Sequence, residues 1–546
     1  MKHSVLTFSI LTVISTYAHS TLPNAGSISR EIKQETKPTA VQAVEIGQKS
    51  AREAQESDNI PLEVKTIRLV GLEAVGESEL ASLLVDSQGK TVTLGQLRDL
   101  TDKITAYYHQ QGYVLAKAIL PPQRIENGEV VIQVFEGKIA SIQQQNQSRV
   151  KESVVQGYLN HIQVGKALNN QQAERALLLI KDLAGVGEVN YSLAEGQQAG
   201  ETNLIANLGE APAVRGNLSV DNHGSESTGE KRVRANVYLQ SPFGRGETIS
   251  LQGMSSLRGL DYGRVGLELP LGYNGLSFNS SFSRTRYELG GNFANLNADG
   301  SSDTVDFGVR YPLLRTNQHN LWLASGGEIR RLTDSVRATN TETKKAVRAG
   351  NLSINGSFQD SLGAGGYTQL SLQNTFGRLN IRSAEARAID AASAKTQGSY
   401  YKLTANLNRT QYFNQQWSLW ANVSVQWSNK NLDSGEQMSI GGLDGVSAYS
   451  SNAVSGDKGI LANLQLRYAV NPYITLLGFY DVGGAKLRNK PFAQGKNHRR
   501  LQGAGVGLNI QVKQLAIEAK SAWKIHPTNI EKGKNPRVWV NVRYYF

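Results

Sequence analysis

The segment Trp417-Ser-Leu-Trp-Ala-Asn-Val-Ser-Val-Gln-Trp427 is the part of this 546-residue sequence that best indicates the fold. One face carries Trp417, Leu419, Ala421, Val423, Val425 and Trp427, and the other carries Ser418, Asn422, Ser424 and Gln426. A period of two is typical of a β-strand. About ten residues at roughly 3.3 Å each, tilted by about 40°, span roughly 25 Å, the height of an outer-membrane apolar band. The segment therefore predicts a membrane-spanning strand with a tryptophan at each interface.

The same alternation recurs from residue 212 to the end, for example in Arg232–Gln240 and Tyr262–Leu269. Gly/Asn/Asp/Ser clusters separate the segments, such as Asp221–Gly229, Asn295–Ser302 and Asn340–Lys345. We expect a barrel of about sixteen antiparallel strands over 212–546, an even number within the bacterial range. A large soluble β-sandwich or β-solenoid also alternates and is the alternative.

The two ends of the chain favour the barrel. Residues 1–20 combine Lys2, a short apolar run and small residues before Ser20, which is the layout of a secretory signal peptide. The last strand ends on Tyr544 and Phe546. An aromatic carboxy-terminus is what outer-membrane barrels present to their assembly machinery, so both residues are candidate assembly signals.

Composition excludes several other classes. The chain has no Cys, 54 Gly, 39% apolar residues and a mean hydropathy of −0.36. A polytopic helical membrane protein would need repeated runs of about 20 apolar residues. The missing Cys excludes disulfides and cysteine-ligated metals, and the sequence holds no H-E-x-x-H, G-x-S-x-G or phosphate-binding loop. We expect no enzyme, no cofactor, no metal and no nucleic-acid partner.

The mature chain divides near residue 211. Residues 1–211 hold 19 Lys+Arg and 23 Asp+Glu, a net charge of −4, whereas residues 212–546 hold 39 and 23, a net of +16. In the first part, helices at Leu94–Gln111 and Gln171–Leu183 are each followed by two short strands. This repeat predicts two α+β modules in tandem, over 61–137 and 138–211. Ahead of them we expect a short helix within 21–36 and a flexible linker over 37–60. A disordered terminus is the alternative for the helix.

With the apolar face outside, the positive charge falls on the lumen and the loops. A charged lumen indicates a conduit or a plugged channel rather than a packed core. The alternative is that these cations balance inward carboxylates or anionic lipopolysaccharide near the loops. The cations expected to face inward are Arg264, Arg310, Lys402, Arg409, Arg467 and Arg543.

Several motifs carry a family resemblance. Leu120-Pro121-Pro122-Gln123 is followed by Val134-Phe135-Glu136-Gly137, and the barrel opens with Val220-Asp221-Asn222-His223-Gly224. In this order the motifs resemble the transporter component of two-partner secretion (TpsB), within the insertase-like superfamily of barrels with periplasmic POTRA domains. The resemblance implies that Pro121, Pro122, Gln123 and Gly137 belong to the first POTRA domain.

The resemblance also implies an inward-folded loop at 430–457. Its motif would be Gly441, Gly442, Val446, Ser447, Ala448 and Tyr449, where the family pattern at the tip is V/I-R-G-Y/F. Ser447 stands where Arg is expected and Ala448 where Gly is expected. The partner F-x-D motif is Phe479-Tyr480-Asp481, with Phe479 and Asp481 facing inward. Either Ser447 anchors the loop more weakly, or Asp481 pairs with another cation such as Arg467.

By this resemblance the protein exports one large unfolded exoprotein, such as a hemolysin, an adhesin or a contact-dependent toxin, to the cell surface. POTRA sheet edges would receive the client, since an unfolded chain can add a strand there. The helix at 21–36 would plug the lumen at rest. Implied partners are the exoprotein, outer-membrane lipid and the barrel-assembly machinery. A barrel-assembly insertase or a passive porin are the alternatives, and both share the outer-membrane location.

Overall fold

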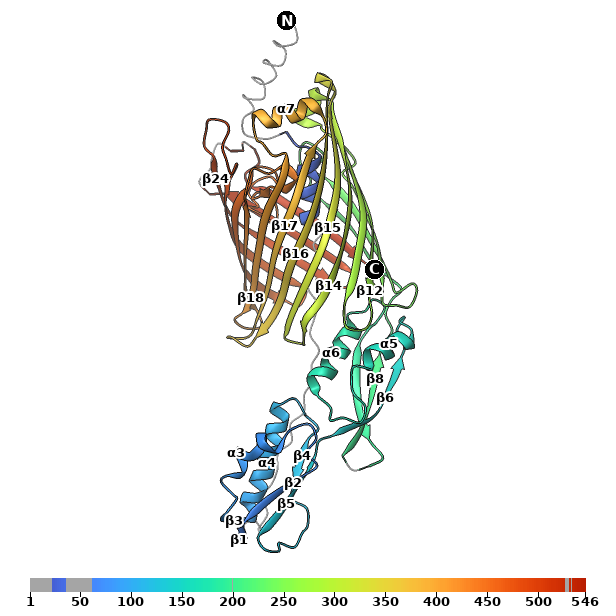
Figure 1. The fold of residues 1–546 in the computed structure, drawn as a ribbon. Helices are drawn as coiled ribbons and strands as arrows, with labels where there is room; N and C mark the ends of the chain where they lie inside the picture. Colours follow the sequence, from blue (N-terminus) through green and yellow to red (C-terminus); the bar gives the residue numbers. More distant parts are fainter. Residues whose placement is uncertain (1–21, 36–60, 199, 526–529, 532) are drawn as a thin grey trace.

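The computed structural model describes residues 22–35, 61–198, 200–525, 530–531 and 533–546 (Figure 1). The expected signal peptide at 1–20 and linker at 37–60 lie outside these residues. Two small α+β modules stand below a tall β-barrel, and a short helix lies inside the barrel (Figure 1). None of the described helices combines the length and apolar character that crossing a membrane would require.

The first module packs two helices on a small sheet. Strand β2 runs parallel to β5, which pairs antiparallel with β4. Thr93 caps α4, where its side chain accepts from the Gln96 N–H and the Gln96 side chain accepts from the Thr93 N–H. The elements are β1 (Pro61–Val64), β2 (Thr66–Val70), α3 (Glu77–Leu84), β3 (Lys90–Thr93), α4 (Leu94–Gln110), β4 (Lys117–Ile119) and β5 (Glu129–Phe135).

The second module repeats this plan. Its sheet has the order β6-β8-β7, with β6 and β8 parallel. The apolar stripe of α6, including Ala173, Leu177 and Ile180, is buried against the sheet, as its helical period requires. The elements are β6 (Lys138–Asn146), α5 (Glu152–Leu159), α6 (Asn170–Lys181), β7 (Val189–Glu195) and β8 (Glu201–Leu208).

The barrel is closed and has sixteen antiparallel strands, which confirms the prediction. Val423, Val425 and Trp427 of β19 are exposed on the outer wall, whereas Asn422 and Gln426 are buried on the lumen side. The strands are β9 (Val214–Asp221), β10 (Arg232–Gln240), β11 (Thr248–Ser255), β12 (Leu260–Pro270), β13 (Ser277–Glu288), β14 (Ala298–Arg315), β15 (His319–Val336), β16 (Thr341–Asp360), β17 (Gly366–Ile381), β18 (Gly398–Tyr412), β19 (Trp417–Ser428), β22 (Lys458–Asn471), β23 (Ile474–Lys486), β24 (His498–Val512), β25 (Leu515–Lys524) and β26 (Arg537–Tyr545).

Two of the expected separators are partly strand. β14 begins at Ala298 and β16 at Thr341, so Asn295–Ser302 and Asn340–Lys345 contain only the tips of hairpins. β16 has 20 residues, about twice the length needed to cross the apolar band. The first residues of β16 are polar on both faces, yet they pair with the neighbouring strands. The hydropathy pattern did not reveal this part of the strand because it lacks apolar alternation.

The lumen holds two further pieces of chain. Helix α2 (Ala25–Glu35) lies inside the upper part of the barrel, toward the end that carries helix α7 (Ala384–Ala392) (Figure 1). The connection from β19 to β22 folds back into the barrel and contains η4 (Ser434–Glu436), β20 (Met438–Ser439) and β21 (Ser455–Gly456). α2 packs on η4 and on β13, β14 and β15, so helix and loop fill the lumen together.

Candidate functional site: the occluded lumen

Arg30 is the main polar link between α2 and the inward loop. Its side chain is 7% exposed. One guanidinium nitrogen donates to the Ser434 carbonyl (2.6 Å) and the Gln437 carbonyl (3.2 Å), and the other to Asn452 Oδ1 (3.1 Å) and Ser455 Oγ (3.0 Å). Hydrogen bonds from a charged donor are stronger than neutral ones. Arg30 therefore joins α2 to both strands of the loop.

The first turn of α2 sits directly on the loop and the wall. A Cβ at Gly26 would lie 2.9 Å from the Gly435 nitrogen, so the close approach of helix and loop requires glycine there. The Ala25 N–H donates to Asp334 Oδ1 on β15 (2.7 Å), which also accepts from the Tyr287 hydroxyl (2.6 Å). The start of the helix is thus fixed to the barrel wall independently of Arg30.

The base of the inward loop is held to the wall by buried ion pairs. Asp433 accepts from Lys345 Nζ (2.7 Å), and Glu436 accepts from Lys402 Nζ (2.7 Å) and Arg330 (3.2 Å). Each of these side chains is at most 16% exposed. Breaking a buried ion pair by removing one partner costs about 3–5 kcal/mol, because the other charge is left unpaired. The pairs fasten the loop to β15, β16 and β18.

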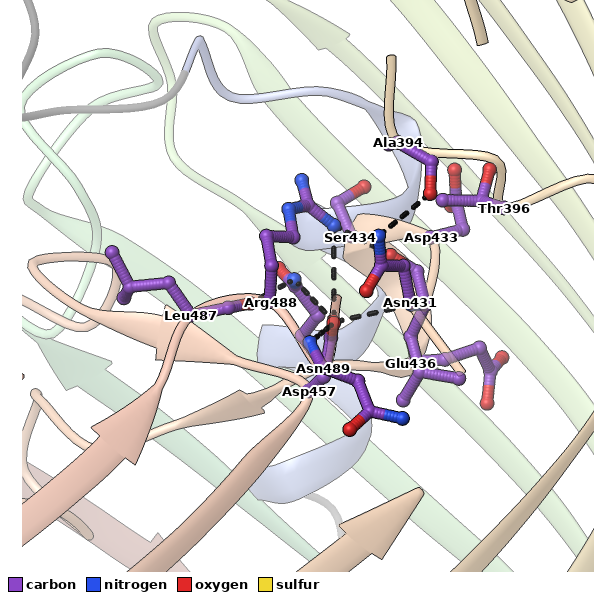
Figure 2. A network of polar contacts seen from close by, with 12 residues as sticks. Ala394, Thr396, Asn431, Asp433, Ser434, Glu436, Asp457, Leu487, Arg488 and Asn489 are labelled. Carbon is purple, nitrogen blue, oxygen red and sulfur yellow. Dashed lines mark hydrogen bonds and ion pairs between the residues drawn. The ribbon is translucent and has the colours of Figure 1, made fainter. Parts of the chain in front are cut away.

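A second network gathers three extracellular connections around Asp457 (Figure 2). Its fully buried carboxylate accepts from the Leu432 N–H (3.1 Å), Gln437 Nε2 (2.8 Å) and the Asn489 N–H (2.7 Å). Asn431 Nδ2 donates to the Ala394 carbonyl (2.8 Å), in the connection after α7. Both ends of the inward loop are therefore tied to the loops above the barrel.

At the tip of the loop, Ser447 is bonded to Asp481. The Ser447 hydroxyl (2.6 Å) and N–H (3.1 Å) both donate to Asp481 Oδ2, and Asn463 Nδ2 donates to Oδ1 (2.8 Å). Trp539 Nε1 donates to the Ser447 carbonyl (2.7 Å). Arg467 instead donates to Gln465 Oε1 and lies over the Trp420 ring, so the alternative in which Arg467 pairs with Asp481 is wrong.

The other motif residues at the tip are closely packed against one another and against the wall. Val446 and Ala448 are fully buried. Gly503 on the wall leaves room for Ala448, because a side chain at position 503 would place its Cβ 2.8 Å from the Ala448 Cβ. Gly441 forms a bridge with Val446, and Gly442 has a φ of +93°, which favours glycine. The Tyr449 ring is buried under Lys524 Nζ (5.1 Å to its centroid). Phe479 is buried on the same wall as Asp481.

A polar cavity of about 530 Å³ lies beside α2 and the loop tip. Its lining includes Glu31, Gly441, Asp481, Asn541 and Arg543, the last of which lies toward the periplasmic end of β26. Asn and Ser side chains on neighbouring strands of this wall bond one another, as Asn406 does with Asn422 (2.9 Å) and Ser424 (2.6 Å). The part of the lumen beside the plug is therefore lined mainly with polar side chains.

One of the expected lumen cations points the other way. Arg409 is opposite Ala421, on the face of β18 and β19 that carries Val423 and Trp427, so its assignment to the lumen is wrong. It lies at the periplasmic end of the outer wall, where Asp360 (2.8 Å) neutralises it. Strand tips can place charges outward because they leave the apolar band.

The POTRA motif residues lie far from the loop, in the first module. The side-chain amide of Gln123 forms the two hydrogen bonds that a neighbouring strand would form with β5. Its Nε2 donates to the Val131 carbonyl (2.7 Å), and its Oε1 accepts from the Val131 N–H (2.7 Å). Pro121 and Pro122 precede Gln123, and Gly137 (φ +71°) ends the first module against Leu115. Beside Gly137, burial and the Glu136 carboxylate raise the pKa of the Tyr108 hydroxyl, which donates to Glu136 (2.8 Å).

The second module is clamped to one side of the periplasmic rim. Arg315 at the end of β14 makes a bidentate pair with Asp182 (2.7 and 2.8 Å), and Glu174 accepts from the Asn317 N–H (2.8 Å). Tyr273, in the turn after β12, packs edge-on against Tyr158 at 5.6 Å between centroids. These contacts involve the end of β14 and the turns after β12 and β14, which hold the module beside the mouth of the lumen.

We predict that the substitution Asp182→Arg loosens this clamp and that the swap Asp182→Arg/Arg315→Asp restores it in part. Asp182 is 32% exposed, so we expect a loss of about 2 kcal/mol, less than for a fully buried pair. Because the chain has no Cys, spin labels can be placed uniquely through Val164→Cys and Gln415→Cys. A label–label distance distribution that does not broaden in the single variant would contradict the prediction.

The seam of the barrel uses the carboxy-terminus. β26 pairs with β9 over Asn541–Tyr545, and Phe546 exchanges both backbone hydrogen bonds with Gly216 (2.9 and 3.1 Å). Tyr544 and Phe546 are about half exposed on the outer wall. Above the paired residues, Asn222 continues the seam with its side chain, which binds the Val538 carbonyl (2.9 Å) and the Val540 N–H (2.7 Å).

Comparisons with known proteins agree with this architecture. The sequence model described as haemolysin secretion/activation protein ShlB/FhaC/HecB matches residues 200–510, and the ShlB-type POTRA domain matches residues 62–137. Over 540 residues the chain is 28% identical to the heme/hemopexin transporter protein HuxB of Haemophilus influenzae, covering 95% of this chain and 94% of that protein. It is 24% identical to the hemolysin transporter protein HpmB of Proteus mirabilis over the whole of both chains.

Among solved structures, CdiB from Escherichia coli superposes with a TM-score of 0.77 at 18% identity, covering 96% of this chain and 100% of that one. This similarity shows a common fold. The family match spans more than half of the chain. The protein therefore belongs to the ShlB/FhaC/HecB family of haemolysin secretion/activation proteins, which are outer-membrane transporters of two-partner secretion with periplasmic POTRA domains.

Proposed function

We propose that this transporter receives a single large exoprotein at its POTRA domains and passes it unfolded through the barrel, after α2 and the inward loop have been displaced. The observation that carries the proposal is the closure of a polar lumen by two separate segments, α2 and residues 430–457, which are bonded to one another through Arg30. Both segments are held by side chains rather than by membership of the barrel sheet. They can therefore leave without opening the barrel wall.

The receptor surface in this proposal is the edge of the POTRA sheets. In the second module β6 and β7 are the outer strands of a three-stranded sheet, and β2 and β4 are the outer strands in the first. An extended client can add a strand to such an edge, where main-chain hydrogen bonds supply affinity. The clamp through Asp182 and Arg315 holds the second module beside the lumen entrance, so a bound segment starts close to the conduit.

The energy for transport would come from folding of the client outside the cell, since the sequence contains no phosphate-binding loop. No catalytic step is part of the proposal. The client would be a hemolysin, an adhesin or a toxin, and its identity lies in the partner gene. We also propose that the exposed Tyr544 and Phe546 are read by the barrel-assembly machinery before the outer wall meets lipid.

The decisive experiment is to delete the gene and compare surface and secreted proteins with those of the parent strain. Two-partner secretion predicts the loss of one very large exoprotein and unchanged levels of other outer-membrane barrels. Complementation with the full chain should restore the exoprotein, and complementation with a chain that lacks residues 61–137 should not. A broad loss of barrels would indicate an insertase instead, and an unchanged exoprotein profile would indicate a porin.

A further inference from the structure

Three arginines stand together on the outer wall of the barrel. Arg348 on β16 is directly opposite Arg378 on β17. Arg331 on β15 is opposite Ala346, which is the next outward-facing residue of β16 on the extracellular side of Arg348. All three side chains are exposed. Their neighbours in the register show that they face lipid rather than the lumen, because Arg348 is also opposite the exposed Ile329. Arginine is rare on such a wall within the apolar band.

The arginines lie immediately above an aromatic belt. Phe376, two residues before Arg378, is 62% exposed on the same face. Its ring stacks on Tyr401 (5.0 Å between centroids), which contacts Trp427 (5.9 Å). Aromatic girdles mark the interfaces of outer-membrane barrels. Because β17 leads directly into the extracellular connection with α7, the arginines occupy the headgroup level of the outer leaflet.

In the described part of the protein, no ion pair neutralises Arg348 and Arg378, which are opposite one another. No carboxylate among these residues forms an ion pair with Arg331 either, although Asp303, which pairs with Arg284 (3.5 Å), lies directly opposite Arg331 in the register. Like charges directly opposite one another on a sheet are destabilising. The pair Arg348–Arg378 therefore costs stability unless an anion lies between the two guanidinium groups.

We propose that Arg331, Arg348 and Arg378 bind a phosphate of an outer-leaflet glycolipid, of the kind that lipid A carries on its glucosamine headgroup. A guanidinium matches phosphate oxygens through two parallel N–H donors, and three of them can surround one phosphate. The acyl chains of the same lipid would lie along the apolar wall below, beside Phe376 and Ile329. The site follows from the outer-membrane location and is independent of which client is secreted.

The test compares Arg348→Gln/Arg378→Gln with the wild-type chain in detergent. The matched control is Arg387→Gln/Arg500→Gln, which removes two exposed extracellular-side arginines from α7 and β24 and changes the net charge equally. Native mass spectrometry would measure binding of bis-phosphorylated lipid A, of dephosphorylated lipid A and of inorganic phosphate. We expect wild type and control to bind bis-phosphorylated lipid A with similar affinity and the Arg348/Arg378 variant to bind it at least tenfold more weakly.

Thermal unfolding gives a second readout that does not depend on the affinity measurement. Without lipid, the double variant should unfold at the same temperature as the wild type or higher, because the like-charge contact is gone. Adding bis-phosphorylated lipid A should raise Tm for wild type and control but not for the variant. Four results would each overturn the proposal. The Arg348/Arg378 variant could bind bis-phosphorylated lipid A as tightly as the wild type does, or the control could lose as much affinity as the variant. The wild type could also bind dephosphorylated lipid A, or inorganic phosphate, as tightly as it binds bis-phosphorylated lipid A.

Discussion

The substitution Arg30→Ala should open the channel. It removes four hydrogen bonds that a buried guanidinium makes to the inward loop, at Ser434, Gln437, Asn452 and Ser455. A loss of about 3 kcal/mol, the upper value for one charge-assisted interaction, shifts the ratio of open to closed molecules roughly a hundredfold. Single-channel recording in planar bilayers should therefore show a large rise in open probability. Cells that carry the variant should become more sensitive to bulky antibiotics.

The matched control is Lys33→Ala on the same helix. Lys33 Nζ contacts Glu328 (2.5 Å) and Asp306 (3.4 Å), but its side chain is 38% exposed and Glu328 keeps its second partner, Arg330. We expect a smaller rise, under tenfold. Deleting residues 21–36 sets the upper limit for the effect. An Arg30→Ala channel that stays closed, in a barrel that still shows heat-modifiable migration on gels, would contradict the assignment of Arg30 as the link.

The substitution Asp481→Ala should release the tip of the inward loop. It leaves the Ser447 hydroxyl and the Ser447 N–H without their acceptor in a buried site, and Asn463 Nδ2 keeps only its bond to the Gly445 carbonyl (2.8 Å). Each buried donor without an acceptor costs about 1–3 kcal/mol. We expect secretion of the partner exoprotein to fall at least tenfold and the conductance to become noisy, because the tip no longer has one position on the wall.

Ser447→Ala is the graded control. It removes the hydroxyl bond and keeps the backbone N–H on Asp481 and the Trp539 bond to the Ser447 carbonyl. The free-energy cost should be about 1 kcal/mol, and secretion should fall only a few-fold. The two variants together measure how much the side chain at position 447, as distinct from its backbone N–H, contributes to holding the loop tip on Asp481. If Ser447→Ala were as damaging as Asp481→Ala, the backbone contact would be irrelevant and this account of the tip would be wrong.

Most of the fold is accessible from the sequence because the hydrophobic pattern reports it directly. The face of Trp417–Trp427 that was predicted to point outward is the exposed face. The prediction of about sixteen strands agrees with the sixteen strands of the barrel. The pattern fails where apolar contrast ends. The upper parts of β14 and β16 lack apolar alternation, and the charge of Arg409 alone gave no indication that its strand turns that side chain outward.

The sequence and the family resemblance anticipated the plug helix, the inward loop and the contact at the loop tip, but not the polar contacts that hold the helix and the base of the loop. Ser447 and Asp481 were found through the family pattern, but the backbone N–H of Ser447 adds a bond that side-chain chemistry does not predict. The ion pairs at the loop base join residues 34 to 106 positions apart, as in Asp433 with Lys345 and Glu436 with Lys402 or Arg330. Only the closed barrel brings such residues together, and of these five residues the sequence singled out only Lys402, as an inward-facing cation.

The position of the plug has a consequence for the order of events in export. α2 lies in the upper part of the barrel, where it is bonded to the inward loop (Figure 1). The polar cavity beside them has Arg543 in its lining, toward the periplasmic end of β26. In the proposed export, a client segment would enter this cavity while α2 and the inward loop still close the lumen. The membrane would keep its permeability barrier during this loading step, and opening would be a late step triggered by a client that is already inside.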